Sequence, residues 1–240
     1  HTNLESNMDS DGCLICNSGL QYSENSFIAV CEFCKKSFDS NTKCSNGHFI
    51  CDACHQSSGF EIIDHMCKNS KSTNPAELAT LIMNSPKINM HGPEHHFLVP
   101  AVLLTAYYNK IGNPEMISEK LKIAKDRSKK ILGGFCGFYG NCGAGVGTGI
   151  FMSIVLNCTP LSKNEWKLSN LMVSQSLHDI AMMGGPRCCK RDTYLSIEKA
   201  LEFVHEHLNI KLDGYNILCN FSERNKECIT KECKYQKNSL

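Results

Sequence analysis

The chain has 240 residues, a formal net charge of +1 and a sequence pI of about 7.6. It is longer than one small module requires, so we expect a buried core together with a separate unit held by metal. The near-neutral charge gives no indication of binding to nucleic acid, anionic lipid or acidic partners. Sixteen cysteines would suggest a disulfide scaffold in a short secreted protein, but here they include CxxC pairs with a histidine among them, which predicts metal binding.

The first ten residues, HTNLESNMDS, are polar and lack the apolar segment of a signal peptide, so we interpret 1–10 as a tag or a disordered end. The longest apolar stretches, residues 97–104 and 150–156, fall short of the roughly 20 residues that a membrane-spanning helix requires. We therefore predict a soluble, cytoplasmic protein without a membrane partner. The sequence leaves the oligomeric state open.

In chain order, residues 11–67 are rich in turns, with strand-like segments at 26–30 and 48–50, and predict a small α+β module of the zinc-ribbon or cross-brace type. Beyond a polar linker, apolar spacing and cap residues predict helices over residues 75–83, 93–109, 113–132, 143–156, 163–183 and 193–207. We therefore predict a mainly α fold, with a helical domain at 72–212 that contains a loop rich in glycine and cysteine. A cysteine-containing tail, residues 213–240, is expected to pack on this domain.

The predicted module carries eight candidate metal ligands. Two CxxC knuckles each place two sulfurs on a tight turn that converges on one tetrahedral ion, and the run CxxxHxxCxxC supplies four more ligands. The candidates are Cys13, Cys16, Cys31, Cys34, Cys44, His48, Cys51 and Cys54. Eight ligands predict two zinc ions, and a sequential arrangement, with the first four ligands on one ion and the last four on the other, fits the spacing. Closed four-ligand sites are usually scaffolds, so we expect this module to dock a partner rather than to catalyse a reaction.

The run CSNGHFICDAC, residues 44–54, resembles the central Cys-His-Cys-Cys stretch of RING-type and related cross-brace zinc fingers. The resemblance implies that alternate ligand pairs share an ion. One ion would then be held by Cys13, Cys16, Cys44 and His48, and the other by Cys31, Cys34, Cys51 and Cys54. The last cysteine pair of a true RING is missing, because only Cys67 follows, so ubiquitin-ligase activity is not implied.

Outside the module lie Cys67, Cys136, Cys142, Cys158, Cys188, Cys189, Cys219, Cys228 and Cys233. Burial as a small apolar side chain would account for Cys67 and Cys158. Cys136 and Cys142 sit among glycines just before a predicted helix. There, free N–H groups and the helix dipole would lower a thiol pKa or stabilise the sulfides of an iron–sulfur cluster.

Cys188 and Cys189 follow a Gly-Gly-Pro turn and are flanked by Arg187, Lys190 and Arg191. These cations would favour the thiolate form or bind a carboxylate substrate. The pair is therefore a second candidate for a cofactor or substrate site.

The tail carries Cys219, Cys228 and Cys233, whose spacing is adequate for three ligands of a [4Fe–4S] cluster. A third zinc ion with a remote fourth ligand is the competing interpretation. Because a reducing compartment keeps thiols free, we predict an iron–sulfur cluster held by cysteines outside the module.

The run His91-Gly-Pro-Glu94-His95-His96 opens the helix expected at 93–109. Its side chains are candidates for metal binding or proton transfer. The alternative is that they cap the helix and lie at the surface, because acidic and polar groups at a helix start satisfy free N–H groups.

Two segments, FCGFYGNCGAGVGTGIFMS and GPRCCKRDTYLSIEKA, together resemble parts of the iron–sulfur L-serine dehydratase family. That family has a glycine-rich Cys turn before a helix of small residues, and a later Pro-Cys-x-x-Arg turn. The resemblance implies a cluster in which one iron is not held by protein and acts as a Lewis acid on the substrate. The family's intermediate ligand motif is absent here, and the zinc module has no place in it.

The chain as a whole resembles an uncharacterised cysteine-rich family of anaerobic bacteria and archaea, on the basis of HGPEHHFLVPA, the glycine-cysteine loop, GGPRCCKRD and the tail pattern CNFSxxNxxC. We predict a metalloprotein with structural zinc and an iron–sulfur or thiolate site, acting as a lyase or sulfur-transfer enzyme on a small anionic substrate. Its catalytic candidates are Glu94, His95, His96, Cys136, Cys142 and Arg187. The alternative is a non-catalytic zinc-binding adaptor for a protein partner.

Overall fold

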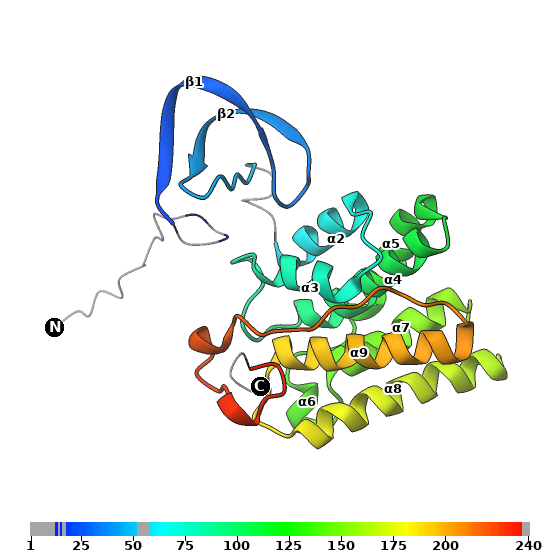
Figure 1. The fold of residues 1–240 in the computed structure, drawn as a ribbon. Coiled ribbons are helices and arrows are strands. Elements are labelled where there is room, and N and C mark those ends of the chain that lie inside the picture. Colours follow the sequence, from blue (N-terminus) through cyan, green and yellow to red (C-terminus); the bar gives the residue numbers. More distant parts are fainter. Residues whose placement is uncertain (1–12, 14, 16–17, 52–57, 237–240) are drawn as a thin grey trace.

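A computed structural model describes the chain except for residues 1–12, 14, 16–17, 52–57 and 237–240. The expected tag at 1–10 lies outside the described residues. The fold is mainly α, with a small two-stranded antiparallel sheet near the N-terminus, as predicted (Figure 1). In this view the sheet stands at one end of the molecule, above the packed helices.

The sheet is a hairpin of β1 (Leu20–Val30) and β2 (Ser37–Cys44). Both strands differ from the expected segments, since β1 is longer than residues 26–30 and residues 48–50 form no strand. Those residues instead follow the turn after β2 and are tied to the hairpin by backbone hydrogen bonds: the N–H of Glu32 donates to the carbonyl of Phe49, and that of Cys44 to the carbonyl of His48, each at 2.9 Å. The chain therefore folds back beside the turn that follows β1, which brings distant cysteines together.

Residues 59–69 form a helix, α2 (Gly59–Asn69), within the segment expected to be turn-rich. Ser58 and Glu61 close its N-terminus with a capping box. Ile62 and Ile63 are fully buried, and the helix packs on α4 and α5. The capping residues and this apolar pair are visible in the sequence, but the cysteine spacing around them outweighed that signal. The expected module boundary at residue 67 falls inside α2, and the division into domains stays a prediction.

The helices after α2 follow the expected order, except that the short α6 was not expected, and α5 and α9 differ from their expected bounds by four residues. They are α3 (Pro75–Met83), α4 (Glu94–Lys110), α5 (Ile117–Ser128), α6 (Phe135–Phe138), α7 (Gly143–Val155), α8 (Asn164–Met183) and α9 (Cys189–Leu208), with a 3-10 turn, η1 (Pro114–Met116), before α5. Residues 97–106 of α4 are buried on every side of the helix. A helix that is apolar all round lies at the centre of a core, and α4 contacts α2, α3, α5, α7 and α9.

Glycines let α7 approach both α4 and α8. A Cβ on Gly147 would lie 2.8 Å from the Cδ of Pro100 in α4, and one on Gly149 would lie 2.2 Å from a methyl group of Val173 in α8. Because no larger residue fits at either position, these glycines hold the N-terminal end of α7 firmly in place. The loop that carries Cys136 and Cys142 ends there.

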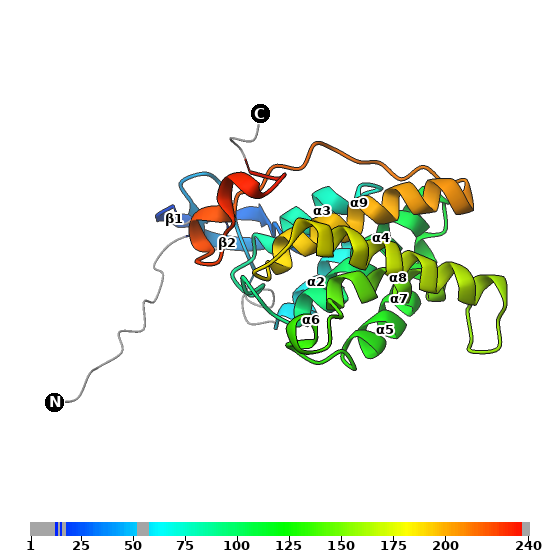
Figure 2. The same ribbon diagram turned by 90° about the horizontal axis from the view of Figure 1, so that it is seen from below.

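α9 begins four residues before the expected start at residue 193. Cys188 is its N-cap residue, so Cys189 to Asp192 form its first turn. The tail after α9 returns along this helix towards its N-terminus, through η2 (Ser222–Arg224) and η3 (Thr230–Glu232) (Figures 1 and 2). Tyr235 fastens it there, because its ring lies 5.3 Å from that of Tyr194 and its hydroxyl donates to Glu198 at 2.7 Å.

Candidate metal centres

The first group of candidate ligands joins Cys13, Cys44 and His48. Cys44 ends β2, and the next turn passes through Gly47, with φ +83°, and brings His48 back towards it. The Nδ1 atom of His48 lies 3.4 Å from the Sγ of Cys44 and 3.8 Å from the Sγ of Cys13. Backbone N–H groups of Ile15 and His48 donate to the two sulfurs.

The second group joins Cys31, Cys34 and Cys51, all buried. Cys31 and Cys34 lie on the turn after β1, and the Sγ of Cys34 is 3.8 Å from the Sγ of Cys51. The N–H of Cys51 donates to the Sγ of Cys31 at 3.4 Å, which joins the two ends of the module. The ligand atoms within each group all lie within 4.8 Å of one another, so both groups could bind a metal ion.

These groups are interleaved along the chain. Cys13 meets Cys44 and His48 rather than Cys31 and Cys34, so the described residues follow the cross-brace pairing and not the sequential one. Cys16 and Cys54, the predicted fourth ligands, lie outside the described residues. The sequence left this pairing open because hairpin register is not encoded in cysteine spacing.

Four further cysteines line one enclosed cavity at the N-terminus of α9, which we call the four-cysteine cavity. They are Cys188, Cys219, Cys228 and Cys233. Cys188 comes from the start of α9, and the other three come from the tail that returns to it. Its volume is about 20 Å³, and its wall is completed by aromatic and aliphatic side chains that include Tyr194, Phe221, Ile229 and Tyr235.

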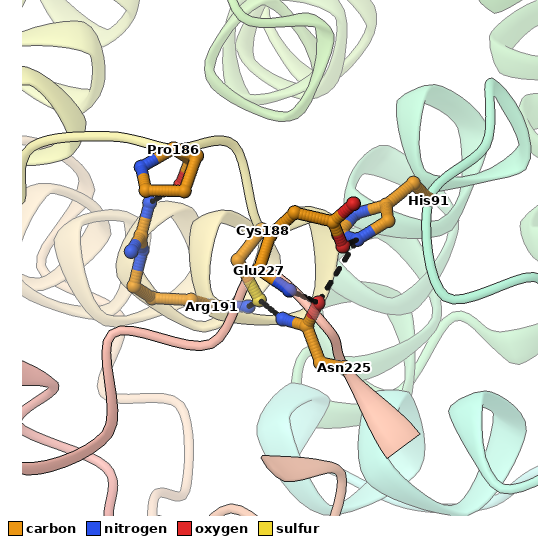
Figure 3. Close-up of polar contacts among 6 residues, drawn as sticks. All are labelled: His91, Pro186, Cys188, Arg191, Asn225 and Glu227. Carbon is orange, nitrogen blue, oxygen red and sulfur yellow. Dashed lines mark hydrogen bonds and ion pairs between the residues drawn. The ribbon is translucent and has the colours of Figure 1, made fainter. Parts of the chain in front are cut away.

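Hydrogen-bond donors point at the sulfurs of Cys188, Cys219 and Cys228. The N–H groups of Phe221, Thr230 and Arg191 donate to Cys219, Cys228 and Cys188 respectively, at 3.4 to 3.5 Å. The side-chain amide of Asn225 adds a second donor to Cys188 at 3.4 Å (Figure 3). N–H donors of this kind stabilise thiolate or metal-bound sulfur.

The wall of the four-cysteine cavity also lies beside a buried cation. Lys190 is 1 % exposed, and its Nζ donates to the carbonyls of Met83 and Ile88 and lies 5.1 Å from the centre of the Phe221 ring. Burial lowers the pKa of Lys190 to about 7. Within the described part of the chain no carboxylate lies close enough to form an ion pair with it.

A second, open cavity of about 500 Å³ lies on the other side of the start of α9. Its charged and sulfur-bearing lining residues are Cys136, Cys142, Arg187, Arg191 and Asp192. The thiol of Cys142 lies 3.6 Å from the carboxylate of Asp192, which also accepts from Arg191 at 3.2 Å. The two predicted cysteine turns therefore meet at this cavity, although Cys188 faces the other one.

Burial changes the expected acidity of these thiols. It raises the pKa of Cys142 to about 12 and that of Cys189 to about 11. The N–H groups of Ala144 and Gly145, at the start of α7, act in the opposite direction on Cys142 but are outweighed. Burial also raises the pKa of Cys188, despite the neighbouring cations. At Cys142 and Cys188 the direction of the pKa shift therefore runs against the expected thiolate form, because burial outweighs the N–H groups and the arginines.

The histidine run lies deeper than a surface cap. Glu94 and His95 are 4 % and 1 % exposed, and the carboxylate of Glu94 accepts from the N–H of Asn89 at 2.7 Å. The Nδ1 atoms of His95 and His96 lie 3.0 and 3.1 Å from the carbonyls of Gly92 and Ile131. None of these three side chains lines either cavity, so their position gives no support to acid–base catalysis, and their role stays a prediction.

His91 connects this run to the tail. Its Nε2 lies 3.1 Å from both the side-chain oxygen of Asn225 and the carboxylate of Glu227 (Figure 3). Since Asn225 also donates to Cys188, a continuous path runs from the histidine turn to the four-cysteine cavity. Asn225 had no signal in the sequence apart from its place in the tail pattern.

Two other residues differ from expectation. Cys158 is half-buried at the end of α7, and not a core residue, whereas Cys67 is fully buried as expected. Asp192 was missed, although it stands only two residues after Lys190 in a run of charged residues. Its importance arises from the earlier start of α9, which turns it inward towards Cys142.

In the described residues no helix is long and apolar enough to cross a membrane.

Comparison with known proteins places the chain in a family. No curated protein and no solved structure matches the chain, so the local resemblances to RING fingers and to serine dehydratases gain no support. Residues 63–236 match the family of unknown function DUF5714, and this range contains both cavities but not the hairpin. The protein therefore belongs to the DUF5714 family, which agrees with the resemblance to an uncharacterised family.

Proposed function

We propose that the protein is a metalloprotein with two zinc ions in its N-terminal module and one [4Fe–4S] cluster at the start of α9. The observation that carries this proposal is the four-cysteine cavity, in which four cysteines from two separate segments surround one enclosed space. The proposed ligands of the cluster are Cys188, Cys219, Cys228 and Cys233.

The geometry of the N-terminal module supports zinc. A tetrahedral ion with Zn–S and Zn–N bonds of about 2.3 and 2.0 Å separates two sulfurs by about 3.8 Å and a sulfur from a nitrogen by about 3.5 Å. The observed 3.8 Å between Cys34 and Cys51, and the 3.4 and 3.8 Å at His48, are close to these values. Cys16 and Cys54 are the proposed fourth ligands, which would complete Cys₃His and Cys₄ sites.

The sulfurs of the four-cysteine cavity are spaced more widely than the ligands of a single ion. A single ion with metal–sulfur bonds of about 2.3 Å leaves no water-sized space among its ligands. The void of about 20 Å³ has room for about one water, so it shows that the four sulfurs do not converge on one point, and the side chains would have to move apart to admit a cluster. Among the described residues, no three of these sulfurs lie mutually within 4.8 Å, in contrast to both groups of the N-terminal module. Wider spacing is what separate iron atoms of one cluster require.

The surroundings of the cavity also favour a cluster. A [4Fe–4S] cluster with four thiolates is anionic, and N–H···S bonds and nearby charge tune its potential. Lys190 and Arg191 are buried beside the cavity, and a buried cation needs a compensating charge. The carboxylate of Glu94 already acts on Lys190 from beyond ion-pair distance, and an anionic centre would add further compensating charge beside its carbonyl and ring partners.

The number of protein ligands restricts the class of reaction that the proposed cluster could perform. The lyase chemistry predicted from the sequence requires an iron that no cysteine holds, so that it can bind the substrate. A complete set of four cysteines leaves no such iron and favours electron transfer instead. Sulfur transfer stays a candidate for the open cavity, because Cys136 and Cys142 line it. The adaptor function would follow if the protein held zinc alone.

The proposal is tested by anaerobic reconstitution with iron and sulfide. We expect a broad absorption band at about 400 nm that is reduced by dithionite. Cys219→Ala should lose most of this band, whereas Cys136→Ala, which removes a half-buried thiol from the open cavity, should keep it. A band that survives Cys219→Ala but is lost in Cys136→Ala would contradict the proposed ligand set, and the absence of any band would contradict the cluster.

A further inference from the structure

The open cavity lies directly beside the four-cysteine cavity, and Arg191 lines both. Arg191 is 4 % exposed, and its guanidinium donates to the carbonyls of Gly184 and Pro186 and to Asp192. Pro186 and Arg191 are seen together in Figure 3. Arg191 is thus a fixed part of the wall, which holds the turn before α9 in place.

Two glycines leave part of the wall of the open cavity without side chains. Gly137 and Gly185 line the cavity, a Cβ on either would meet nothing within 4 Å, and neither has a positive φ. Backbone strain and close packing, the usual reasons for glycine, therefore do not apply here. The lack of a side chain at these two positions leaves this part of the cavity wall bare.

The charges around the cavity are unequal. Asp192 is occupied by Arg191 and by the thiol of Cys142. Arg187, by contrast, is exposed at the cavity and makes no hydrogen bond or ion pair within the described part of the chain. Its guanidinium is therefore available to an anion, and a planar fork of donors suits a carboxylate or a phosphate.

The opposite wall is apolar. Leu177, Ile180 and Ala181 of α8 line it, so a ligand that fills the space would place carbon against this helix. A volume of about 500 Å³ lies in the range of sites for small organic molecules. These features predict a ligand that has an anionic group for Arg187, which makes no ion pair among the described residues, and an apolar portion for α8.

We propose that the open cavity binds a small organic anion, with its carboxylate or phosphate group on Arg187 and its apolar portion on α8. The cavity is formed by this chain alone, so the proposal goes beyond the metal centres and does not depend on them. Cys136 lines the same cavity and is half-buried, which makes its thiol a reporter of what enters.

The test compares two alkylating reagents of nearly equal size, anionic iodoacetate and neutral iodoacetamide. Their rates at Cys136 are read by peptide mass spectrometry on the reduced, zinc-loaded protein and are compared with free glutathione. We expect the ratio of the iodoacetate rate to the iodoacetamide rate to be about tenfold higher at Cys136, because a charge-assisted hydrogen bond holds the reagent. Arg187→Gln should return the ratio to that of glutathione.

A second pair of variants tests the space itself. Gly137→Leu should fill the cavity and slow both reagents at Cys136. Gly133→Leu is the matched control, because Gly133 is equally unhindered and lies outside the cavity. Protection of Cys136 by hexanoate or by hexyl phosphate then separates a carboxylate site from a phosphate site. An equal reagent ratio in the wild type and in Arg187→Gln would overturn the proposal, whatever the iron content of the protein.

Discussion

In the N-terminal module the buried side chains are mostly cysteines, whereas in the helical body they are mostly aliphatic and aromatic. Ile28 and Val30 of the hairpin are even exposed, at 67 % and 51 %. Among its described residues the module therefore has few apolar side chains to form a core, and small units of this kind depend on metal to fold. The helical body has its core around α4 and gathers most of its cysteines around the start of α9.

The two sets of cysteines differ in spacing as well. In the module the ligand atoms converge to within 4.8 Å, and in the body four cysteines stand around a void. Convergent ligands suit one ion, and ligands around a space suit a polynuclear centre. Cysteine therefore stabilises the fold of the module through metal, whereas in the helical body it lines a cavity in a fold that the apolar core already stabilises.

The largest effect is expected from loss of zinc, which should unfold the N-terminal module and leave the helical body folded. Structural zinc supplies about 10–16 kcal/mol to the folding of small zinc domains. In Cys34→Ser, we expect residues 18–51 to lose their protection from hydrogen exchange, while the helices from α2 to α9 keep theirs. Cys158→Ser, at the half-buried end of α7, is the control and should change neither region. A hairpin that stays protected in Cys34→Ser would show that it folds without metal.

The next largest effect concerns the stability of the helical body, which should depend on pH because His95 is buried. Burial lowers the pKa of His95 well below its usual value of 6.5, so the folded state binds fewer protons than the unfolded state. This stability is complete above pH 6.5 and is lost as the pH falls below it. We expect wild type to lose about 1.4 kcal/mol per pH unit below 6.5 relative to His95→Gln. Urea unfolding of both proteins at pH 7.5 and 5.5, followed by helical circular dichroism, measures the difference. Parallel losses in the two proteins would rule out this role for His95.

The smallest effect is expected from removing a hydrogen-bond donor at the four-cysteine cavity. Asn225→Ala removes a donor to Cys188 and the link to His91, so we expect a loss of about 1 kcal/mol in stability. Because N–H···S bonds favour the reduced, more negative cluster, the midpoint potential should also become more negative. Asn220→Ala is the control, since Asn220 lies in the same tail and, among the described residues, its side chain bonds to Asn84 and to no cysteine. An unchanged potential in Asn225→Ala would argue against a metal-bound sulfur at Cys188.

Much of the body could be read from the sequence. The helix over residues 75–83 was predicted with its exact bounds because Pro75 and its cap residue mark the start. α2 was missed because cysteine spacing dominated that region, and α9 was started too late because the cysteines and charges at 188–192 do not form an apolar stripe. Local signals therefore predicted the helices wherever the apolar pattern was regular.

The candidate sites were predicted less completely, since they depend on contacts between distant segments. Knuckle spacing identified the ligands of the module, but only the hairpin register groups Cys13 with Cys44. The tail's three cysteines pointed to a cluster, and Cys188 joins them only because the chain turns back along α9. No local pattern contains that return.

Metal and sulfide analysis of protein purified without oxygen tests the central claim most directly. We expect about four iron and four acid-labile sulfide per chain in the four-cysteine cavity, and about two zinc in the module. About three zinc per chain with no iron and no sulfide would contradict it. The four cysteines at the start of α9 would then hold a single ion, and the protein would be a zinc-binding adaptor.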